Sequence, residues 1–452
     1  MNPSVVRHYI FALILIIIYS SCKKDDKPVL VNGNNHNDDT SFTVPETRDI
    51  ILYEINERAF SLTGDFAGIT ARLDSIKALS VNVIWLMPIH PIGTVNSVNS
   101  PYSVKNYLEV NPEYGTMNDL KNLVGKAHER EMAVILDWVA NHTAWDNPWI
   151  SNASWYTQVN GEIVHPPGTN WLDVADLNYN NADMRQAMIS AMKFWIEEAN
   201  VDGFRCDAAD MVPFDFWKQA IDSLQAIPDR DLILLAEGAR ADHFTAGFQM
   251  NFSWNFYGQL KNVFNGQSAA TLFTTHNAEY NGIPDEKHKL RFTTNHDESA
   301  WDATPMVLFD GADGALAASV IAIYLGGVPL IYGSQEVGRQ NTVPFFSNSP
   351  IDWTSHPEML NAYKEILSYF AGSETMKKGS LTTYNHNDIL FFQKSFSLET
   401  VLVLVNVRNN AKTLAIPAEL QNTDWTDVFS NQSVTLGSQV DLSSFNYMVL
   451  KK

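Results

Sequence analysis

The sequence is poor in cysteine and in basic residues. Only Cys22 and Cys206 occur among 452 residues, so no disulfide framework is expected. Lys and Arg number 31 against 51 Asp and Glu, which gives a formal net charge of −20. Binding to a nucleic-acid backbone needs a clustered basic surface, and this charge balance argues against it. The same charge does not oppose the binding of a neutral ligand.

Long apolar runs are also scarce. The run Ile10 to Ile18 is too short to span a bilayer as a folded helix, so the N-terminus is interpreted as a secretory signal. Small residues before Cys22 resemble a bacterial lipoprotein cleavage site, at which this cysteine becomes the lipidated N-terminus. Ordinary cleavage that leaves Cys22 free is the alternative. The resemblance implies a signal peptide over residues 1–22 and an anchor at Cys22.

The residues after Cys22 predict a tether. Lys23-Lys24-Asp25-Asp26 resembles the charged tract that follows the anchor in surface-exposed lipoproteins of the Bacteroidetes type. The rest of residues 23–47 is rich in Asn and Asp and has little to bury, which is typical of a flexible linker. We therefore expect a membrane partner through the lipid anchor and a place in the cell envelope, on the outer membrane surface or its periplasmic face.

From Asp49 the chain alternates strand-like apolar runs with helical patterns, which is typical of parallel βα units. The expected strands are Ile50–Ile55, Val81–Met87, Ala133–Val139, Gly203–Ala208, Leu232–Glu237, Gly247–Phe252, Lys289–Asn295 and Val328–Gly333. The expected helices include Phe66–Leu79, Met117–Arg130, Met184–Glu198, Phe214–Leu224, Ala312–Tyr324 and Pro357–Phe370. Eight such units predict an α/β fold, a (β/α)8 TIM barrel, over residues 48–372.

Two regions do not fit the alternation. Residues 142–181 form a connection that exceeds ordinary loop lengths, which favours a functional excursion, although each of its tryptophans could serve only to pack it. Residues 373–452 are rich in strands and turns and predict a C-terminal antiparallel β-sandwich domain. The strands expected there are Ile389–Ser395, Thr400–Asn406, Lys412–Ile416, Val434–Leu436 and Tyr447–Leu450.

Polar groups gather at the C-terminal ends of four of the expected barrel strands. Arg205 and Asp207 alternate with apolar residues, so both side chains point to one face, where the guanidinium would lower the pKa of the carboxyl. A buried pair that only fixes packing is the alternative. The ends of barrel strands are where a βα barrel builds its active site. The four stretches read DWVANHT, GFRCDAAD, LAEG and FTTNHDE.

In order and spacing these stretches resemble the four signature regions of the α-amylase family of glycoside hydrolases, over roughly residues 46 to 450. The resemblance implies that the long connection is a small domain B excursion after strand 3. It also implies a retaining mechanism, with Asp207 as nucleophile, Glu237 as acid/base and Asp297 as a third carboxylate that binds sugar hydroxyls. We expect the Asp207 and Glu237 carboxyls to lie about 5–5.5 Å apart.

Further roles follow from matching positions. Tyr102 matches the aromatic platform under the sugar at the cleavage point, and His142 and His296 would donate hydrogen bonds to that sugar. Asn141 stands at the family's calcium position, and Asp176 resembles a second ligand. With a backbone carbonyl near Met211 they could hold Ca²⁺. An Asn–Asp hydrogen bond without metal is the alternative.

The chain also departs from the family pattern. Many α-amylases carry Lys-His where this chain has Asp210 and Met211, which puts the usual acceptor-side binding in doubt. Ala208 after the nucleophile leans toward α-1,4 linkages. The sequence thus predicts a monomeric α-amylase acting on starch, glycogen or maltooligosaccharides. The alternatives are a neopullulanase, cyclomaltodextrinase, α-glucosidase or glucanotransferase and, from another class, a non-catalytic glucan-binding surface lipoprotein.

Overall fold

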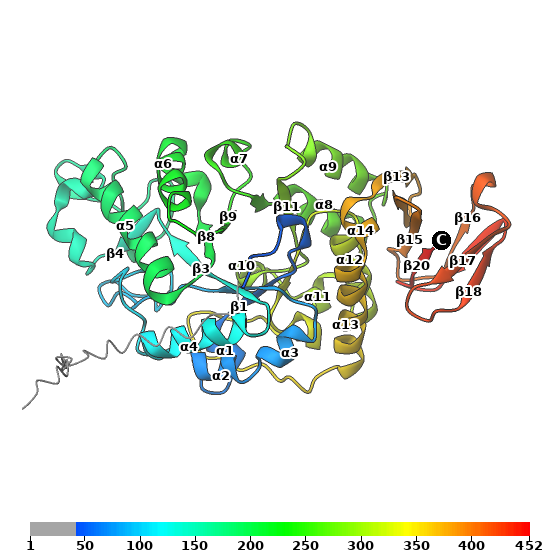
Figure 1. Cartoon of the computed structure of the whole chain (residues 1–452), viewed down its shortest axis with the longest axis horizontal. Coiled ribbons are helices and arrows are strands. Elements are labelled where there is room, and N and C mark those ends of the chain that lie inside the picture. The colour runs from blue at the N-terminus through cyan, green and yellow to red at the C-terminus, as the bar shows by residue number, and fades with distance from the viewer. Residues whose placement is uncertain (1–41) are drawn as a thin grey trace, which may run out of the picture. The chain divides into compact units, whose positions relative to one another are not determined.

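The computed structural model describes residues 42–452, and the predicted signal peptide, the anchor at Cys22 and most of the linker lie outside them. Eight parallel strands close into a barrel in the order β1-β12-β11-β10-β9-β8-β3-β2. Figure 1 shows the barrel helices with the C-terminal strands beside them. The strands are β1 (Leu52–Ile55), β2 (Val83–Leu86), β3 (Ala133–Val139), β8 (Gly203–Asp207), β9 (Ile233–Ala236), β10 (Met250–Phe252), β11 (His288–Arg291) and β12 (Val328–Tyr332). The predicted TIM barrel is confirmed.

The strands are apolar on both faces because each face is covered. Alternate residues such as Ile135 and Leu235 fill the barrel interior together with Trp85. Their neighbours, such as Val134 and Leu136, pack outward against the helices in the main core. This two-sided burial is what short, continuous apolar runs in a parallel sheet predict.

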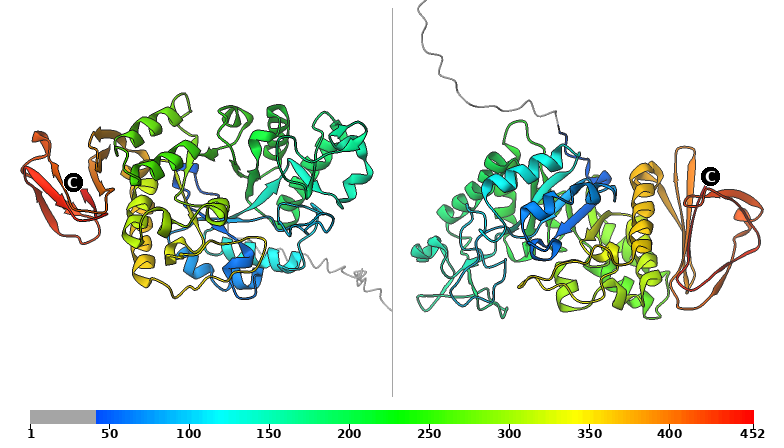
Figure 2. Two further views of the ribbon diagram at one scale, coloured as in Figure 1. Left: turned by 180° about the vertical axis from the view of Figure 1, so that it is seen from behind. Right: turned by 90° about the horizontal axis from the view of Figure 1, so that it is seen from below.

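Helices surround the barrel (Figure 2). The main ones are α4 (Met117–His128), α5 (Ala182–Ala199), α6 (Phe214–Gln225), α8 (Trp254–Phe264), α9 (Thr271–Tyr280), α12 (Ala312–Tyr324) and α13 (Pro357–Gly372). The single helix expected over residues 66–79 is instead two short ones, α2 (Phe66–Thr70) and α3 (Leu73–Lys77). The break at Arg72 brings its guanidinium 4.0 Å from the centre of the Trp353 ring, a contact that a continuous apolar pattern does not reveal. No helix in residues 42–452 is long and apolar enough to cross a membrane.

The excursion after β3 consists of short pieces. β4 (His142–Ala144) pairs with β7 (Val174–Asp176), and β5 (Gln158–Val159) pairs with β6 (Glu162–Ile163), each in antiparallel fashion. Aromatic rings pack together in this region. The centre of the Trp149 ring lies 4.9 Å from that of Tyr107 and 5.4 Å from that of Trp155.

The C-terminal region forms a six-stranded antiparallel sheet, β13-β14-β15-β20-β17-β18, with a separate β16-β19 pair. These strands are β13 (Ser380–Tyr384), β14 (Ile389–Phe396), β15 (Glu399–Asn406), β16 (Lys412–Ala415), β17 (Thr423–Asp427), β18 (Ser433–Leu436), β19 (Gln439–Leu442) and β20 (Tyr447–Lys451). Leu404 and Leu414, one from each sheet, belong to one core. The region contacts the barrel helices: α12 packs against β15 and Phe264 stacks on Phe445 at 5.8 Å.

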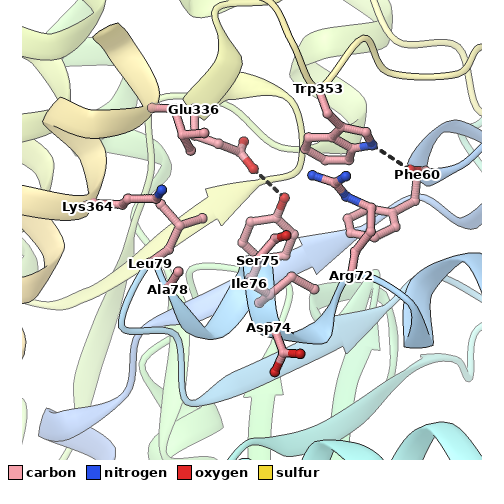
Figure 3. A pocket seen from close by; sticks show the side chains of 12 residues that line it. Phe60, Arg72, Asp74, Ser75, Ile76, Ala78, Leu79, Glu336, Trp353 and Lys364 are labelled. Carbon is pink, nitrogen blue, oxygen red and sulfur yellow. Dashed lines mark hydrogen bonds between the residues drawn. The ribbon is translucent and has the colours of Figure 1, made fainter. Parts of the chain in front are cut away.

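A cavity of about 280 Å³ lies on the outside of the barrel between α3 and α13 (Figure 3). On its inner wall the buried Glu336 accepts a 2.5 Å hydrogen bond from Tyr53. At its rim the Trp353 indole donates to the Phe60 carbonyl at 2.9 Å. These bonds fasten the long segment between β12 and α13 to the N-terminal part of the barrel.

Candidate active site

Two carboxylates meet at the ends of neighbouring strands. In the parallel register of β8 and β9, Cys206 lies opposite Ala236, so the next residues, Asp207 and Glu237, emerge side by side. The fully buried Arg205 contacts both: one terminal nitrogen lies 3.0 Å from Asp207 Oδ1 and the other 2.8 Å from Glu237 Oε1. The predicted pair is therefore brought together on one guanidinium.

Two further side chains hold that guanidinium. Asp137, at the end of β3, lies 2.7 Å from Arg205 and accepts hydrogen bonds from Tyr102 at 2.9 Å and Trp85 at 3.2 Å. The guanidinium carbon also lies 4.9 Å from the centre of the Trp85 ring, within cation–π range. We call Arg205, Asp137, Asp207 and Glu237 the Arg205 cluster.

The backbone after the first carboxylate is left-handed. Ala208 has φ 42°, an unusual value for a residue with a Cβ atom. In this conformation its N–H donates a 2.7 Å hydrogen bond to Glu237 Oε2. The strain is thus coupled to the position of Glu237, as is common for backbone outliers at functional sites.

The two carboxyls share one electrostatic environment. Burial raises the pKa of Asp207 well above its usual range, and Glu237 and Asp137 add to this while Arg205 opposes it. Burial likewise raises the pKa of Glu237, against the effect of Arg205. Arg205 lowers the pKa of Asp207 as expected, but desolvation outweighs the arginine, so the net pKa is raised. The pair titrates as a unit that retains a proton at a higher pH than free carboxyls would.

The third carboxylate belongs to a different cluster. Asp297 stands in the first turn of α10 (His296–Trp301), 3.3 Å from Nε2 of His296. On the other side of the ring, Nδ1 lies 2.5 Å from the buried Glu54. Although burial lowers it, the pKa of His296 is raised well above normal by these two carboxylates. We call His296, Glu54, Asp297 and Tyr102 the His296 cluster.

The positive charge on His296 lowers the pKa of its neighbour Asp297. Burial raises the pKa of Asp297, but His296 and Arg205 more than offset this, so the net pKa is lowered. Tyr102 stacks on the His296 ring at 5.4 Å, and its hydroxyl lies 2.7 Å from His296 Nε2. The structure therefore joins the predicted residues Tyr102, His296 and Asp297.

His142 completes the set of predicted substrate ligands. It begins β4, and its ring lies 5.4 Å from that of Trp171. Burial lowers the pKa of His142 to about 4, so the ring is neutral at ordinary pH and has one N–H to donate.

Glu54 and Asp137 were missed by sequence reasoning. Each is a lone carboxylate inside or at the end of an apolar strand, which is the signal that could have found them. Both are fully buried, a position in which charged residues are rare unless they are paired.

The predicted calcium ligands are Asn141, which directly precedes β4, and Asp176, which ends the paired strand β7. Asp176 of β7 lies opposite His142 of β4, and the Leu177 N–H donates to the Asn141 carbonyl at 3.2 Å. In residues 42–452 the Asn141 side chain pairs with the His142 ring at 3.3 Å, and no hydrogen bond joins it to the Asp176 side chain. Within that range no group of three or more His, Cys, Asp or Glu could hold a metal by itself. The side chains present fit Ca²⁺ only as a partial ligand set, to be completed by carbonyls or water.

Asp210 has a structural role where the family pattern has a lysine. Its carboxylate accepts hydrogen bonds from the N–H groups of Ala239 at 3.1 Å and Arg240 at 3.3 Å. A Cβ atom at Gly238 would lie 2.4 Å from Asp210 Oδ1, so glycine is required directly after Glu237. Asp210 therefore holds the loop that follows the second carboxylate, while the neighbouring Met211 is 41% exposed.

A (β/α)8 barrel with a carboxylate pair on adjacent strand ends, and a third carboxylate beside it, defines a glycoside hydrolase. A family model, "Alpha amylase, catalytic domain", matches residues 31–162 and 169–378. Since this is most of the chain, the protein belongs to the α-amylase family.

Individual relatives agree with this assignment. "Alpha-amylase 3" of Dictyoglomus thermophilum is 25% identical over 490 residues, covering 91% of this chain and 94% of that protein. "Alpha-amylase MalA" of Haloarcula japonica is 26% identical over 409 residues, covering 85% and 58%. Among solved structures, an α-amylase from Lactobacillus plantarum superposes with a TM-score of 0.81 at 26% identity, covering 90% of this chain and 99% of that one.

Proposed function

We propose that this chain is a retaining α-amylase that hydrolyses α-1,4-glucosidic bonds of starch, glycogen or maltooligosaccharides. The observation that carries the proposal is the contact of both Asp207 and Glu237 with one buried guanidinium. This geometry gives two carboxyls that compete for one proton, so that one can act as a nucleophile while the other acts as an acid.

The reaction proceeds in two displacements. Glu237 donates its proton to the glycosidic oxygen while Asp207 attacks C1, so the C1–oxygen bond breaks and a glycosyl ester forms on Asp207. Glu237, now ionised, removes a proton from a water that attacks C1 and releases Asp207. The product keeps the α configuration because C1 is inverted twice.

The His296 cluster prepares the sugar for this attack. The lowered pKa of Asp297 keeps it ionised, so it accepts hydrogen bonds from sugar hydroxyls. His296, charged between Asp297 and Glu54, and the neutral His142 each supply donors. Tyr102 presents a ring fixed by its stacking on His296.

Related activities are the second candidate. Asp210 holds a loop here instead of offering a cation to the acceptor side, which favours a different acceptor preference. A "Cyclomaltodextrin glucanotransferase" of Bacillus licheniformis is 24% identical over 411 residues, covering 79% of this chain and 55% of that protein. The non-catalytic alternative is disfavoured because Asp207, Glu237 and Asp297 are all present and mutually placed.

The product profile on amylose and pullulan, with the anomeric configuration read early by NMR, tests the proposal. Short α-configured maltooligosaccharides from amylose are expected. Panose, glucose alone or rearranged glucans would move the assignment to the related activities. Glucan binding without any product would revive the non-catalytic alternative.

Two accessory features complete the proposal. Asn141 and Asp176 would bind Ca²⁺ and pin the excursion to the barrel, so EDTA should lower the melting temperature and added Ca²⁺ should restore it. Cys22 would carry a lipid that tethers the enzyme to the cell envelope, so Cys22→Ala should move it from the membrane to the soluble fraction. An unchanged melting curve or fractionation would contradict the respective feature.

A further inference from the structure

A large apolar side chain stands exposed beside the carboxylates. Trp301 ends α10, four residues after Asp297, and is 67% exposed. Residues four apart on a helix lie on one face, so the indole points to the same side as Asp297. The Trp301 N–H is one of the groups that lower the pKa of Asp297, whereas burial raises it.

Trp301 leans on an aromatic wall. Its ring meets Phe345 edge-on at 5.8 Å and Phe346 at 5.7 Å. Phe345 in turn lies 5.5 Å from the His296 ring and 6.0 Å from the Tyr102 ring. Aromatic contacts therefore run without a break from the Tyr102 platform to Trp301.

Hydrogen bonds to the backbone fix the position of Phe345 and Phe346. Arg58 donates to the Phe345 carbonyl at 2.9 Å, and Asn99 donates to the Phe346 carbonyl at 2.7 Å. The far end of the same segment is fastened by the bond from Trp353 to the Phe60 carbonyl (Figure 3). A ring supported by fixed groups can bind a ligand with little loss of conformational entropy.

Contacts within the protein do not account for the exposed part of the Trp301 ring. The edge contacts to Phe345 and Phe346 need only one side of the indole, and the rest of the ring stays in water. An exposed aromatic surface next to a polar site is characteristic of ligand binding. The chain also lacks the Lys-His pair expected for acceptor-side binding. Asp210, which stands at the lysine position, accepts hydrogen bonds from the backbone of Ala239 and Arg240 instead.

We propose that the exposed indole face of Trp301 is a stacking platform for a glucose unit adjoining the unit held at the cleavage point. The inference rests on the proposed α-glucan substrate. It makes Trp301 a substrate-binding residue that determines how strongly longer glucans are held.

Binding to an inactive enzyme tests the platform apart from turnover. In the full chain carrying Asp207→Asn, maltoheptaose is titrated by calorimetry, alone and together with Trp301→Ala or Trp301→Phe. The alanine variant should bind about tenfold more weakly, a typical effect for one stacked ring. The phenylalanine variant keeps a ring but loses the N–H near Asp297, and it should bind within about twofold of the parent. Leu398→Ala, which trims a 99% exposed side chain in the C-terminal region, is the control and should change nothing.

The outcomes separate the platform from the proposed function. Equal binding by the parent and the alanine variant would overturn the platform and leave the amylase assignment intact. An equal loss in the phenylalanine and alanine variants would also overturn it, because the N–H rather than the ring would then be responsible. If the parent itself does not bind maltoheptaose and the wild type releases no sugar from amylose, the proposed function fails first.

Discussion

The Arg205 cluster and the His296 cluster lie at the same end of the barrel and use the same residue types in opposite ways. In the first, burial raises the pKa of Asp207 and Glu237 in spite of a shared arginine. In the second, a charged His296 lowers the pKa of Asp297, whose side chain is also more exposed, 40% against 12% for Asp207 and 16% for Glu237. The pKa of a carboxyl in this site is therefore raised where burial outweighs the cation beside it and lowered where the cation outweighs burial. One cluster is thus suited to proton transfer and the other to fixed charge.

Removing either member of the carboxylate pair should have the largest effect. Asp207→Asn is expected to reduce kcat by at least about 10⁴-fold, because no glycosyl ester can form. Glu237→Gln should reduce it by about 10²–10⁴-fold, because the leaving oxygen is no longer protonated. Steady-state kinetics on amylose measures both, with circular dichroism to verify folding. Loss of less than about tenfold in a folded variant would mean that the roles are misassigned.

The second largest effect is expected when Asp137, a buried partner of Arg205, is removed. Asp137→Ala removes a fully buried partner of Arg205 and should lower the free energy of unfolding by about 3–5 kcal/mol. Urea denaturation measures this difference. The matched control is Asp74→Ala, which breaks an exposed pair with Arg130 and should change the free energy of unfolding far less. Equal costs would show that the burial of the Arg205 cluster is not what makes it sensitive.

The His296 cluster is tested through its pH dependence. The raised pKa of His296 contributes stability that is fully present below its unfolded value of 6.5 and is lost as pH rises through the folded pKa. Glu54→Gln removes one carboxylate that raises the folded pKa, so the loss of stability should be smaller and should be complete at lower pH. NMR titration of His296 should show a lower pKa in the variant than in the wild type. An unchanged pKa would mean that Asp297 alone sets the charge on the ring.

The smallest effect is expected at the loop behind Glu237. Asp210→Ala removes the acceptor for two backbone N–H groups and should lower kcat by about threefold to tenfold, because Glu237 is then held less firmly. Asp210→Asn retains one oxygen and should recover part of the loss. An alanine variant with wild-type kcat would show that the loop is positioned by other contacts.

The eight strands and the predicted carboxylates could be found from the sequence because both signals are local. Apolar runs that end in polar groups mark buried parallel strands and their functional ends. Glu54 could not be assigned, since its partner His296 is 242 residues away and meets it only in the closed barrel. The strands β13, β17 and β19 were missed because their exposed positions carry polar residues and leave no apolar run. The sequence could not show that burial outweighs Arg205 and raises the pKa of Asp207, because burial depth is not visible in a motif.

Trapping the covalent intermediate would identify the carboxylate that attacks C1. The full chain is incubated with an activated 5-fluoro-α-glucosyl fluoride, which slows both displacements, and is then digested and examined by mass spectrometry. One glucosyl ester is expected, on Asp207, and none in the Asp207→Asn variant. An ester on another residue, or turnover of glucan to β-configured products without any ester, would contradict it.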